Sequence, residues 1–303
     1  MKRSIPTLLL LIACLAPAIS ARADENLAFY GLKGYLFSFS PLVVDGGHAQ
    51  AGIMFSPYKD NSLNCREGHI WAAPISFVMG DGDWWEAGIA THWEFYENTD
   101  AYFDGQDVDT SRSAMGDIFI GGKIRLLGQD QDQFPDQDRG QGIDLSLMPY
   151  VLLPTGERDR GIADLYRFVQ TDEDHPAWGL NLLLGRRFDQ LVLNLNIGLN
   201  YMETDDPDKD EMVRFVALAA EYQVKETLTA YLEFVDIENK DEFNCADCSP
   251  CYDPDAGDDI REIGVGMDWL KNFWGFKLHL GIGLTDTSPD WRVVALVNRN
   301  LFR

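Results

Sequence analysis

The sequence predicts an all-β protein, a closed antiparallel transmembrane β-barrel of about twelve strands. Three observations predict it. Side chains alternate between apolar and polar, the alternating segments are long enough to cross a membrane, and the connections alternate between short and long. Hydrophobic residues make up 46% of the chain, which suits a soluble protein and a barrel with a polar lumen equally well. The pattern therefore decides the fold class, and the composition does not.

The alternation is clearest between Leu191 and Tyr201, where every odd position is apolar and the even positions after Val192 are Asn or Gly. The same pattern runs through residues 263–269 and 274–284. A two-residue period predicts a strand with one apolar face and one polar face. A water-soluble sandwich would alternate in the same way, so the length of the segments has to separate the two folds.

The alternating segments run for about 10 to 14 residues, whereas ordinary strands average about five or six. A tilted strand needs about 9 to 11 residues to span a membrane, so the length favours the barrel. The predicted strands are 47–55, 68–79, 85–96, 113–127, 142–153, 177–188, 191–203, 210–224, 227–237, 259–270, 273–284 and 290–302.

The connections provide an independent test, because outer-membrane barrels have short periplasmic turns and longer outer loops. Tight turns are predicted at 80–83, 188–191, 224–227 and 270–273. The long connections that alternate with them are 56–67, 97–112, 154–176, 204–209, 238–258 and 285–289. The Asp- and Gln-rich connection 128–141 departs from this rule, because it is long and falls on the predicted periplasmic side.

The start of the chain predicts export. A basic beginning, an apolar run over residues 8–15 and an Ala-Arg-Ala site that ends at Ala23 are typical of a cleaved signal peptide. We expect residues 1–23 to be removed, which leaves residues 24–303 as the barrel. No later stretch reaches the ~18 unbroken apolar residues of a spanning helix.

The charge of the chain is strongly acidic, at −24 overall, and the mature chain would have 22 basic and 49 acidic residues, or −27. Such a field disfavours nucleic acid as a partner. It is typical of a solvated acidic exterior, with a divalent cation or a cationic surface as the alternative partner. The five histidines stand in none of the hydrolase or metalloprotease motifs, so we predict no enzymatic activity and no cofactor.

The polar face of each predicted strand gives a set of candidate lumen residues. Placing a Lys or Arg on the lipid face near the midplane would cost about 2–4 kcal/mol, so charged side chains on these strands are expected to face inward. There they either hold the barrel together through ion pairs or line a solute path. The candidates are Glu86, His92, Glu94, Asp117, Lys123, Arg125, Asp144, Arg187, Glu221, Glu233, Glu262, Asp268, Lys277 and His279.

The cysteines offer a second candidate site. An even number in an exported chain favours two disulfides. A zinc or iron–sulfur site is the alternative, since the Cys-x2-Cys-x2-Cys run and one distant cysteine make four thiolate ligands, and free thiols are a third. The residues concerned all lie on predicted outer connections and are Cys65, Cys245, Cys248 and Cys251. Residues 11–14 also resemble a lipobox, which makes lipidation of Cys14 the alternative to cleavage after Ala23.

Three segments resemble one family of outer-membrane barrels: Gly116–Leu127, Pro149–Gly156 and Gly283–Trp291. Together they make the chain, over roughly residues 85–302, similar to the transporter family labelled "MetA-pathway of phenol degradation". The resemblance implies an outer-membrane barrel that takes up aromatic or other apolar compounds. The cysteine cluster is not part of the family pattern.

The expected function is passage of a small molecule, apolar or aromatic, through a channel in the outer membrane of a Gram-negative cell. A barrel of about twelve strands is narrow, which disfavours a general porin. The alternative is a structural scaffold that holds a periplasmic or surface electron-transfer protein, with the cysteine-bearing connection and 128–141 as docking points. The partners expected are therefore outer-membrane lipid, a small-molecule solute and, for the scaffold, a periplasmic protein.

Overall fold

The computed structural model describes residues 26–61, 66–103, 106–128, 142–156, 175–202, 211–238, 259–285 and 288–302. Within these residues thirteen strands form one antiparallel sheet. None of the described residues forms a helix long and apolar enough to cross a membrane. The strands are β1 (Asp45–Asn61), β2 (Arg66–Asp81), β3 (Trp85–Phe103), β4 (Gln106–Met115), β5 (Ile118–Leu127), β6 (Ile143–Leu153), β7 (Ala177–Phe188), β8 (Leu191–Met202), β9 (Glu211–Lys225), β10 (Leu228–Ile237), β11 (Ile260–Lys271), β12 (Trp274–Gly283) and β13 (Trp291–Phe302).

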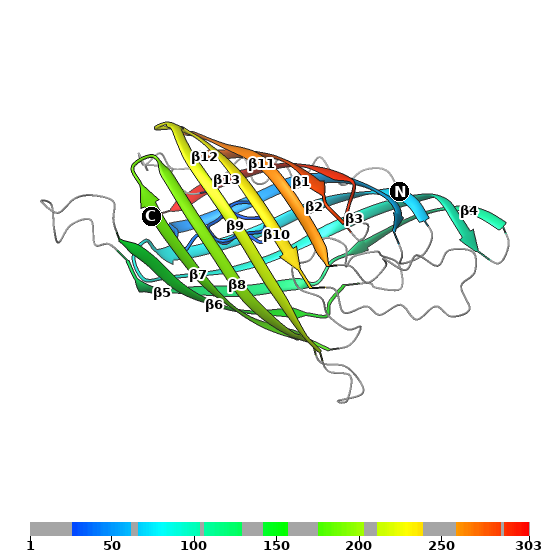
Figure 1. Ribbon diagram of the computed structural model, residues 1–303, viewed down its shortest axis with the longest axis horizontal. Helices are drawn as coiled ribbons and strands as arrows, with labels where there is room; N and C mark the ends of the chain where they lie inside the picture. Colours follow the sequence, from blue (N-terminus) through cyan, green and yellow to red (C-terminus); the bar gives the residue numbers. More distant parts are fainter. Residues whose placement is uncertain are drawn as a thin grey trace, which may run out of the picture.

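The sheet closes on itself, because β1 pairs with β13 as well as with β2 (Figure 1). β4 and β5 both pair with β3, one after the other along its length, and together take the place of one strand of the barrel. The thirteen strands therefore form a twelve-stranded barrel. The predicted closed antiparallel barrel is confirmed. The predicted strand 113–127 is interrupted at Gly116–Asp117, where the Gly116 N–H donates to the His92 carbonyl oxygen at 2.8 Å.

The side chains on the outer face of the wall are apolar, as the alternation predicts. On β8, Leu193, Ile197 and Leu199 are more than 40% exposed, whereas Asn194 and Asn196 are buried. An apolar outer band around a polar interior is the arrangement that lipid requires of a spanning barrel. The exposed leucines therefore mark the surface that faces the hydrocarbon.

The two ends of the barrel differ in their connections. Tight turns follow β2, β7, β9 and β11, as predicted, and we call this end the turn end and the opposite one the loop end. In the turns after β7 and β11, Asp189 and Asn272 have positive φ angles of 52° and 57°, which these two residue types tolerate. Short turns face the periplasm in outer-membrane barrels, which places the turn end there.

Two of the predicted outer connections are wrong. Residues 56–67 and 97–112 are mostly strand, because β1 continues to Asn61, β2 begins at Arg66, and β3 and β4 extend to Phe103 and from Gln106. These extensions are polar and lack a clear two-residue period, so the pattern gave no signal for them. Strand pairing depends on backbone hydrogen bonds, so a hairpin that is surrounded by water can continue without an apolar face.

The N-terminal segment lies inside the barrel, where no element was predicted. Residues 26–44, which we call the plug, form the first blue stretch of the ribbon (Figure 1). They hydrogen-bond to inward-facing side chains of β1, β3, β5, β6, β8, β10 and β12. The plug contains two hairpin-like turns, closed by bridges between Leu27 and Lys33 and between Gly34 and Phe39. Its aromatic residues are at most 4% exposed, and all but Tyr35 form part of one buried cluster with the barrel wall, while Tyr35 packs with Ala219 and Tyr231 of the wall.

Candidate functional site in the barrel lumen

The inner wall of the barrel is polar toward the turn end and mainly apolar toward the loop end. The buried polar side chains of the turn half are His48, Gln50, Ser76, Glu86, Lys123, Ser146, Asn194, Asp268, Lys277, Asn298 and Asn300. The buried apolar side chains of the loop half are Met54, Ile70, Ala72, Leu152, Ala177, Val213, Phe215, Val235, Ile237, Ile260 and Val294. Polar exceptions in the loop half are Ser56, His92, Glu94, Asp117, Asn200 and the pair of Glu262 and Arg292.

A fully buried ion pair fastens the plug near the turn end. Lys123 Nζ of β5 lies 2.6 Å from Glu86 Oε1 of β3, and neither side chain is exposed. The carboxylate also accepts hydrogen bonds from the N–H groups of Lys33 and Val44, at 3.0 and 2.7 Å. The ammonium donates to the carbonyl oxygens of Lys33 and Leu42, at 3.1 and 2.9 Å. Each charge therefore binds both its partner and the plug backbone.

A carboxylate in the middle of the lumen holds the second turn of the plug. Glu233 Oε1 of β10 accepts hydrogen bonds from the N–H groups of Phe37 and Ser38, at 3.0 and 2.5 Å, and from the Ser38 hydroxyl at 2.6 Å. Hydrogen bonds from neutral donors to a buried carboxylate stabilise its charged form. Glu233 therefore fixes the turn at residues 37–38.

A cation on β12 holds the other side of this turn. Lys277 Nζ donates to the carbonyl oxygens of Gly34 and Tyr35, at 2.9 and 2.5 Å, and lies 3.7 Å from Asp268 Oδ1. It also lies 5.2 Å from the ring centroid of Tyr231, which packs on Tyr35. Burial raises the pKa of the Tyr35 hydroxyl well above its ordinary value, and nearby carboxylates raise it further, so this hydroxyl stays protonated.

Neutral side chains complete the contacts of the plug. The Asn196 amide forms two hydrogen bonds with the backbone of Phe39, one from the Phe39 N–H at 2.6 Å and one to its carbonyl oxygen at 2.8 Å. The Ser146 hydroxyl donates to the Pro41 carbonyl oxygen, and Gln50 donates to that of Ala28 at 2.7 Å. The plug's backbone is irregular and buried, and its polar groups are satisfied partly by the lumen side chains and partly by hydrogen bonds within the plug.

Toward the loop end the plug is held by an aromatic contact. The guanidinium of Arg292, on β13, lies 4.7 Å from the ring centroid of Phe37, the residue at the second turn of the plug. Arg292 Nη2 pairs with Glu262 Oε2 of β11 at 2.6 Å, and His279 Nε2 lies 3.9 Å from the same carboxyl group. Phe37 in turn lies 6.0 Å from the ring of Phe29.

A small hollow of about 110 Å³ remains between the plug and the wall near the turn end. Its lining is mostly polar and includes Lys33 and Ser40 of the plug and Arg187, Glu221 and Thr229 of the wall. It lies on the periplasmic side of the plug and offers space for water or a polar group.

Most of the predicted lumen residues are buried inside the barrel. The buried ones are Glu86, His92, Glu94, Asp117, Lys123, Glu233, Glu262, Asp268, Lys277 and His279. Arg125 and Asp144 pair at 2.8 Å and are half-buried, as is Glu221, while Arg187 is exposed at the turn-end mouth. Their role in a solute path stays a prediction.

Three of these residues, His92, Glu94 and Asp117, form contacts that lie away from the plug's charged anchors. His92 hydrogen-bonds to Glu94 on the same strand, and its ring lies 6.1 Å from that of Phe29. Asp117 Oδ1 accepts the Gly156 N–H at 2.7 Å and joins the interruption of the wall to the end of β6. Both are structural contacts of the wall.

Sequence reasoning missed Arg292, Asn196 and Ser146, although all three contact the plug or its partners. On β13 the inward positions 294 and 296 and the outward positions 293 and 297 are all apolar, so parity gave no signal for Arg292. The cysteine prediction concerns Cys65, Cys245, Cys248 and Cys251, which lie outside the described residues, as do the signal peptide and residues 129–141 of the connection 128–141. Within the described part of the chain, no three His, Asp or Glu residues group as metal ligands do.

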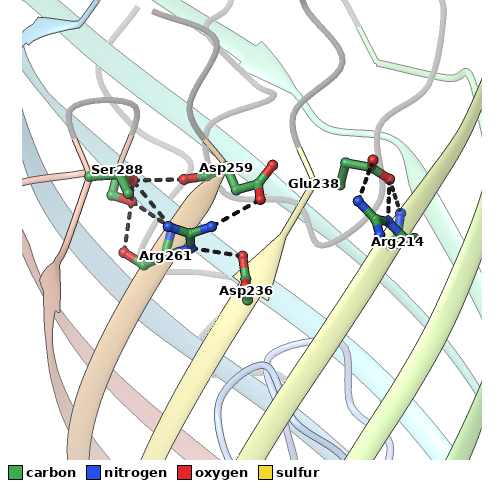
Figure 2. A network of polar contacts seen from close by, with 7 residues as sticks. Arg214, Asp236, Glu238, Asp259, Arg261 and Ser288 are labelled. Carbon is green, nitrogen blue, oxygen red and sulfur yellow. Dashed lines mark hydrogen bonds and ion pairs between the residues drawn. The ribbon is translucent and has the colours of Figure 1, made fainter. Parts of the chain in front are cut away.

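A separate charged network lies at the loop-end rim of the barrel (Figure 2). Arg214 of β9 binds Glu238 through Nε and Nη2, at 3.1 and 2.8 Å, and Arg261 of β11 binds Asp236 and Asp259, at 3.2 and 3.1 Å. The Arg214 side chain is 70% exposed. These contacts tie the ends of β9, β10 and β11 together and do not reach the plug.

Comparison with known proteins places the chain in a family. A family model described as "Putative MetA-pathway of phenol degradation" matches residues 40–294. The chain belongs to this family. The predicted resemblance is therefore confirmed, and the match covers the whole wall from β1 to the first part of β13. No curated protein matches the chain in sequence.

Solved structures show the same fold. The chain is similar to the COG4313 outer membrane channel from Pseudomonas putida F1, at 11% identity over 93% of this chain and 99% of that chain, with a TM-score of 0.52. It is also similar to the KdgM porin (8% identity, 83% and 98% covered, TM-score 0.46) and to the Pseudomonas putida toluene transporter TodX (10%, 92% and 98%, 0.40). The family member described here is thus a multi-pass β-barrel of the outer membrane, as predicted.

Proposed function

We propose that the protein lets small apolar molecules cross the outer membrane through its lumen, and that the plug is the closed gate of this path. The observation that carries the proposal is the group of buried apolar side chains that β6, β7, β9 and β10 place on the inner wall of the loop half, in one buried cluster with aromatic residues of the plug. Apolar side chains cannot replace the hydrogen bonds that ions and sugars make with water, so such a wall disfavours their passage. It suits a solute that leaves water readily.

The described lumen argues against a permanently open channel. The plug backbone is fixed by buried charges on β3, β5, β10 and β12, so its side chains do not leave the path without breaking these contacts. Passage therefore requires a displacement of part of the plug. The family description and the fold shared with an outer membrane channel support the same function.

The path that we propose runs from the apolar loop half, past the second turn of the plug, to the polar hollow at the turn end. The predicted lumen residues nearest to this route are Glu262, His279, Glu233, Lys277, Asp268, Glu221 and Arg187. Cleavage after Ala23 stays a prediction, which intact-mass measurement of the purified protein tests.

Uptake by whole cells tests the proposal, because the lipopolysaccharide leaflet of an intact outer membrane resists apolar solutes. Radiolabelled toluene uptake is measured in cells that produce the wild type, the Glu233→Gln variant or no barrel. We expect the wild type to speed uptake over cells without the barrel. We expect Glu233→Gln, which loosens the second turn of the plug, to speed it further. The lipid-facing Ile197→Ala variant is the matched control and should behave as the wild type.

One observation favours a second function. The filled lumen is also what a purely structural barrel would have, and such a barrel would serve as a scaffold for a periplasmic or surface electron-transfer protein. If toluene uptake is the same with the wild type, with Glu233→Gln and without the barrel, passage is ruled out. Co-purification of a redox partner would then support the scaffold.

A further inference from the structure

We propose that Phe37 occupies a binding site for an aromatic ring, and that an aromatic solute which takes its place over Arg292 releases the second turn of the plug. The inference rests on the proposed function and names both the class of ligand and the residue that selects it. The ligand is a small molecule with a benzene-sized ring. The family match begins at residue 40 and does not include Phe37.

The site is built around a guanidinium that cannot move freely. Arg292 is 2% exposed, and its ion pair with Glu262, itself 5% exposed, holds one edge of the guanidinium at 2.6 Å. A second nitrogen, Nη1, lies 3.6 Å from the sulfur of Met54. The Phe37 ring, which is 4% exposed, covers the guanidinium at 4.7 Å. The structure therefore shows a fixed, desolvated cation with an aromatic ring bound to it.

This geometry selects aromatic rings over saturated ones. The negative face of an aromatic ring attracts a cation, and the attraction grows to about 2 kcal/mol where water is excluded. A saturated ring of the same size fills the space but has no such face. Apolar packing alone would accept both rings, so the preference for an aromatic ring is the signature of Arg292.

The position of the site makes exchange with an outside solute direct. Arg292 and Glu262 lie near the loop-end starts of β13 and β11, and the neighbouring wall residues Val294 and Ile260 are apolar and buried. A solute that enters from the loop end therefore meets this part of the plug before the charged anchors near the turn end. Residues 34–39 are held by Glu233, Lys277 and Asn196 through the backbone and by Arg292 through the Phe37 ring. Loss of the ring contact removes one of these contacts, which loosens residues 34–39 and leaves the Lys123 anchor in place.

Hydrogen exchange on the full mature chain in detergent tests the inference. The probes are benzyl alcohol and cyclohexylmethanol, which match in size and hydroxyl group and differ in the aromaticity of the ring. At equal free concentration, we expect benzyl alcohol to speed amide exchange over residues 34–39 and cyclohexylmethanol to have an effect about tenfold weaker. Residues 41–44, next to the Lys123 anchor, should exchange as slowly as without a probe.

Variants identify Arg292 as the cause. The double variant Glu262→Gln with Arg292→Met removes both charges, so no buried carboxylate is left alone, and we expect it to respond equally to the two probes. Arg214→Met removes a guanidinium from the outer rim and should keep the difference between the probes. In Phe37→Leu, which keeps an apolar side chain but removes the ring, half of the maximal benzyl alcohol response should occur at a concentration about tenfold lower.

Three results would overturn the inference: equal responses of the wild type to both probes, no response to benzyl alcohol, or a difference that persists in the double variant. The whole-cell uptake experiment tests the proposed function separately. If toluene uptake depends on the barrel while the two probes act alike, the channel stands and the aromatic site at Arg292 does not.

Discussion

The plug is held in two different ways at the two ends of the lumen. Near the turn end, Glu86 and Lys123 form an ion pair that is fully buried and also makes four hydrogen bonds to the plug backbone. Near the loop end, the contact is between a side chain of the plug, Phe37, and the guanidinium of Arg292. The contacts of the first arrangement go to backbone atoms of the plug and do not depend on its side chains. The second arrangement depends on one aromatic ring.

The difference separates an anchor from an exchangeable contact. Breaking a buried ion pair by removing one partner costs about 3–5 kcal/mol, because a charge is left without compensation. A ring contact with a buried cation contributes about 2 kcal/mol and can be replaced by another ring. The turn end therefore fixes the plug to the wall, and the loop end is where a ligand competes with it.

The largest effect is expected from Lys123→Met, which leaves the Glu86 carboxylate buried and unpaired. We expect a loss of about 3–5 kcal/mol in the free energy of unfolding, measured by urea unfolding of the barrel in lipid vesicles. The double variant Glu86→Gln with Lys123→Met should lose clearly less, since no charge remains unpaired. Ile124→Ala, on the adjacent lipid-facing position, is the control. A single variant as stable as the wild type would show that the pair does not anchor the plug.

A smaller effect is expected from Glu233→Gln, which weakens the hydrogen bonds from Phe37 and Ser38. Hydrogen bonds to a charged acceptor contribute about 1.5–3 kcal/mol, so the amides of residues 34–39 should exchange roughly tenfold faster or more. Amides near Val44 should keep their wild-type rates. Uniform acceleration along the whole plug would mean that the two ends are not separate.

Gly31→Ala tests the first turn of the plug. Gly31 has a φ of +85°, and a Cβ there would lie 2.4 Å from the Ser76 hydroxyl oxygen on the wall. The left-handed backbone alone costs an L-residue about 1–2 kcal/mol, and we expect faster exchange of residues 28–33. Adding Ser76→Gly should recover the part that is due to the clash. If the double variant behaves as the single one, strain in the backbone is the only cause.

The smallest effect is expected from Ser146→Ala, which removes one hydrogen bond to the Pro41 carbonyl oxygen. We expect a loss of about 1 kcal/mol in the free energy of unfolding, because a single neutral hydrogen bond is removed. Thermal unfolding followed by circular dichroism in detergent measures it. A loss as large as that of Lys123→Met would contradict the ranking of charged above neutral contacts.

The barrel could be predicted from the sequence because lipid imposes a strict two-residue period on the wall. The alternation at residues 191–201 gave the strand, its faces and its bounds almost to the residue. The long polar extensions of β1 to β4 were missed, because strand pairing outside the membrane needs no apolar face. Arg292 was missed because both faces of its strand are apolar around it.

The plug could not be placed from periodicity, because irregular backbone has no period. Its signal was of a different kind: the segment carries Phe29, Tyr30, Tyr35, Phe37 and Phe39 within eleven positions of one another, before the first strand. So many aromatic residues need a buried environment, and a barrel whose outer face is already apolar offers only its lumen. The charged partners on the wall were predicted to face inward, but nothing in the sequence showed that they bind the chain's own backbone.

The plug leads straight into β1, since the Val44 N–H binds Glu86 and the strand starts at the next residue. β1 is also the strand whose pairing with β13 joins the two ends of the chain. Because the plug is joined to β1, it can be enclosed when β1 pairs with β13. It then does not have to pass through a barrel that has already closed. Closure of the β1–β13 pair is therefore compatible with the plug already lying against the charges of the wall.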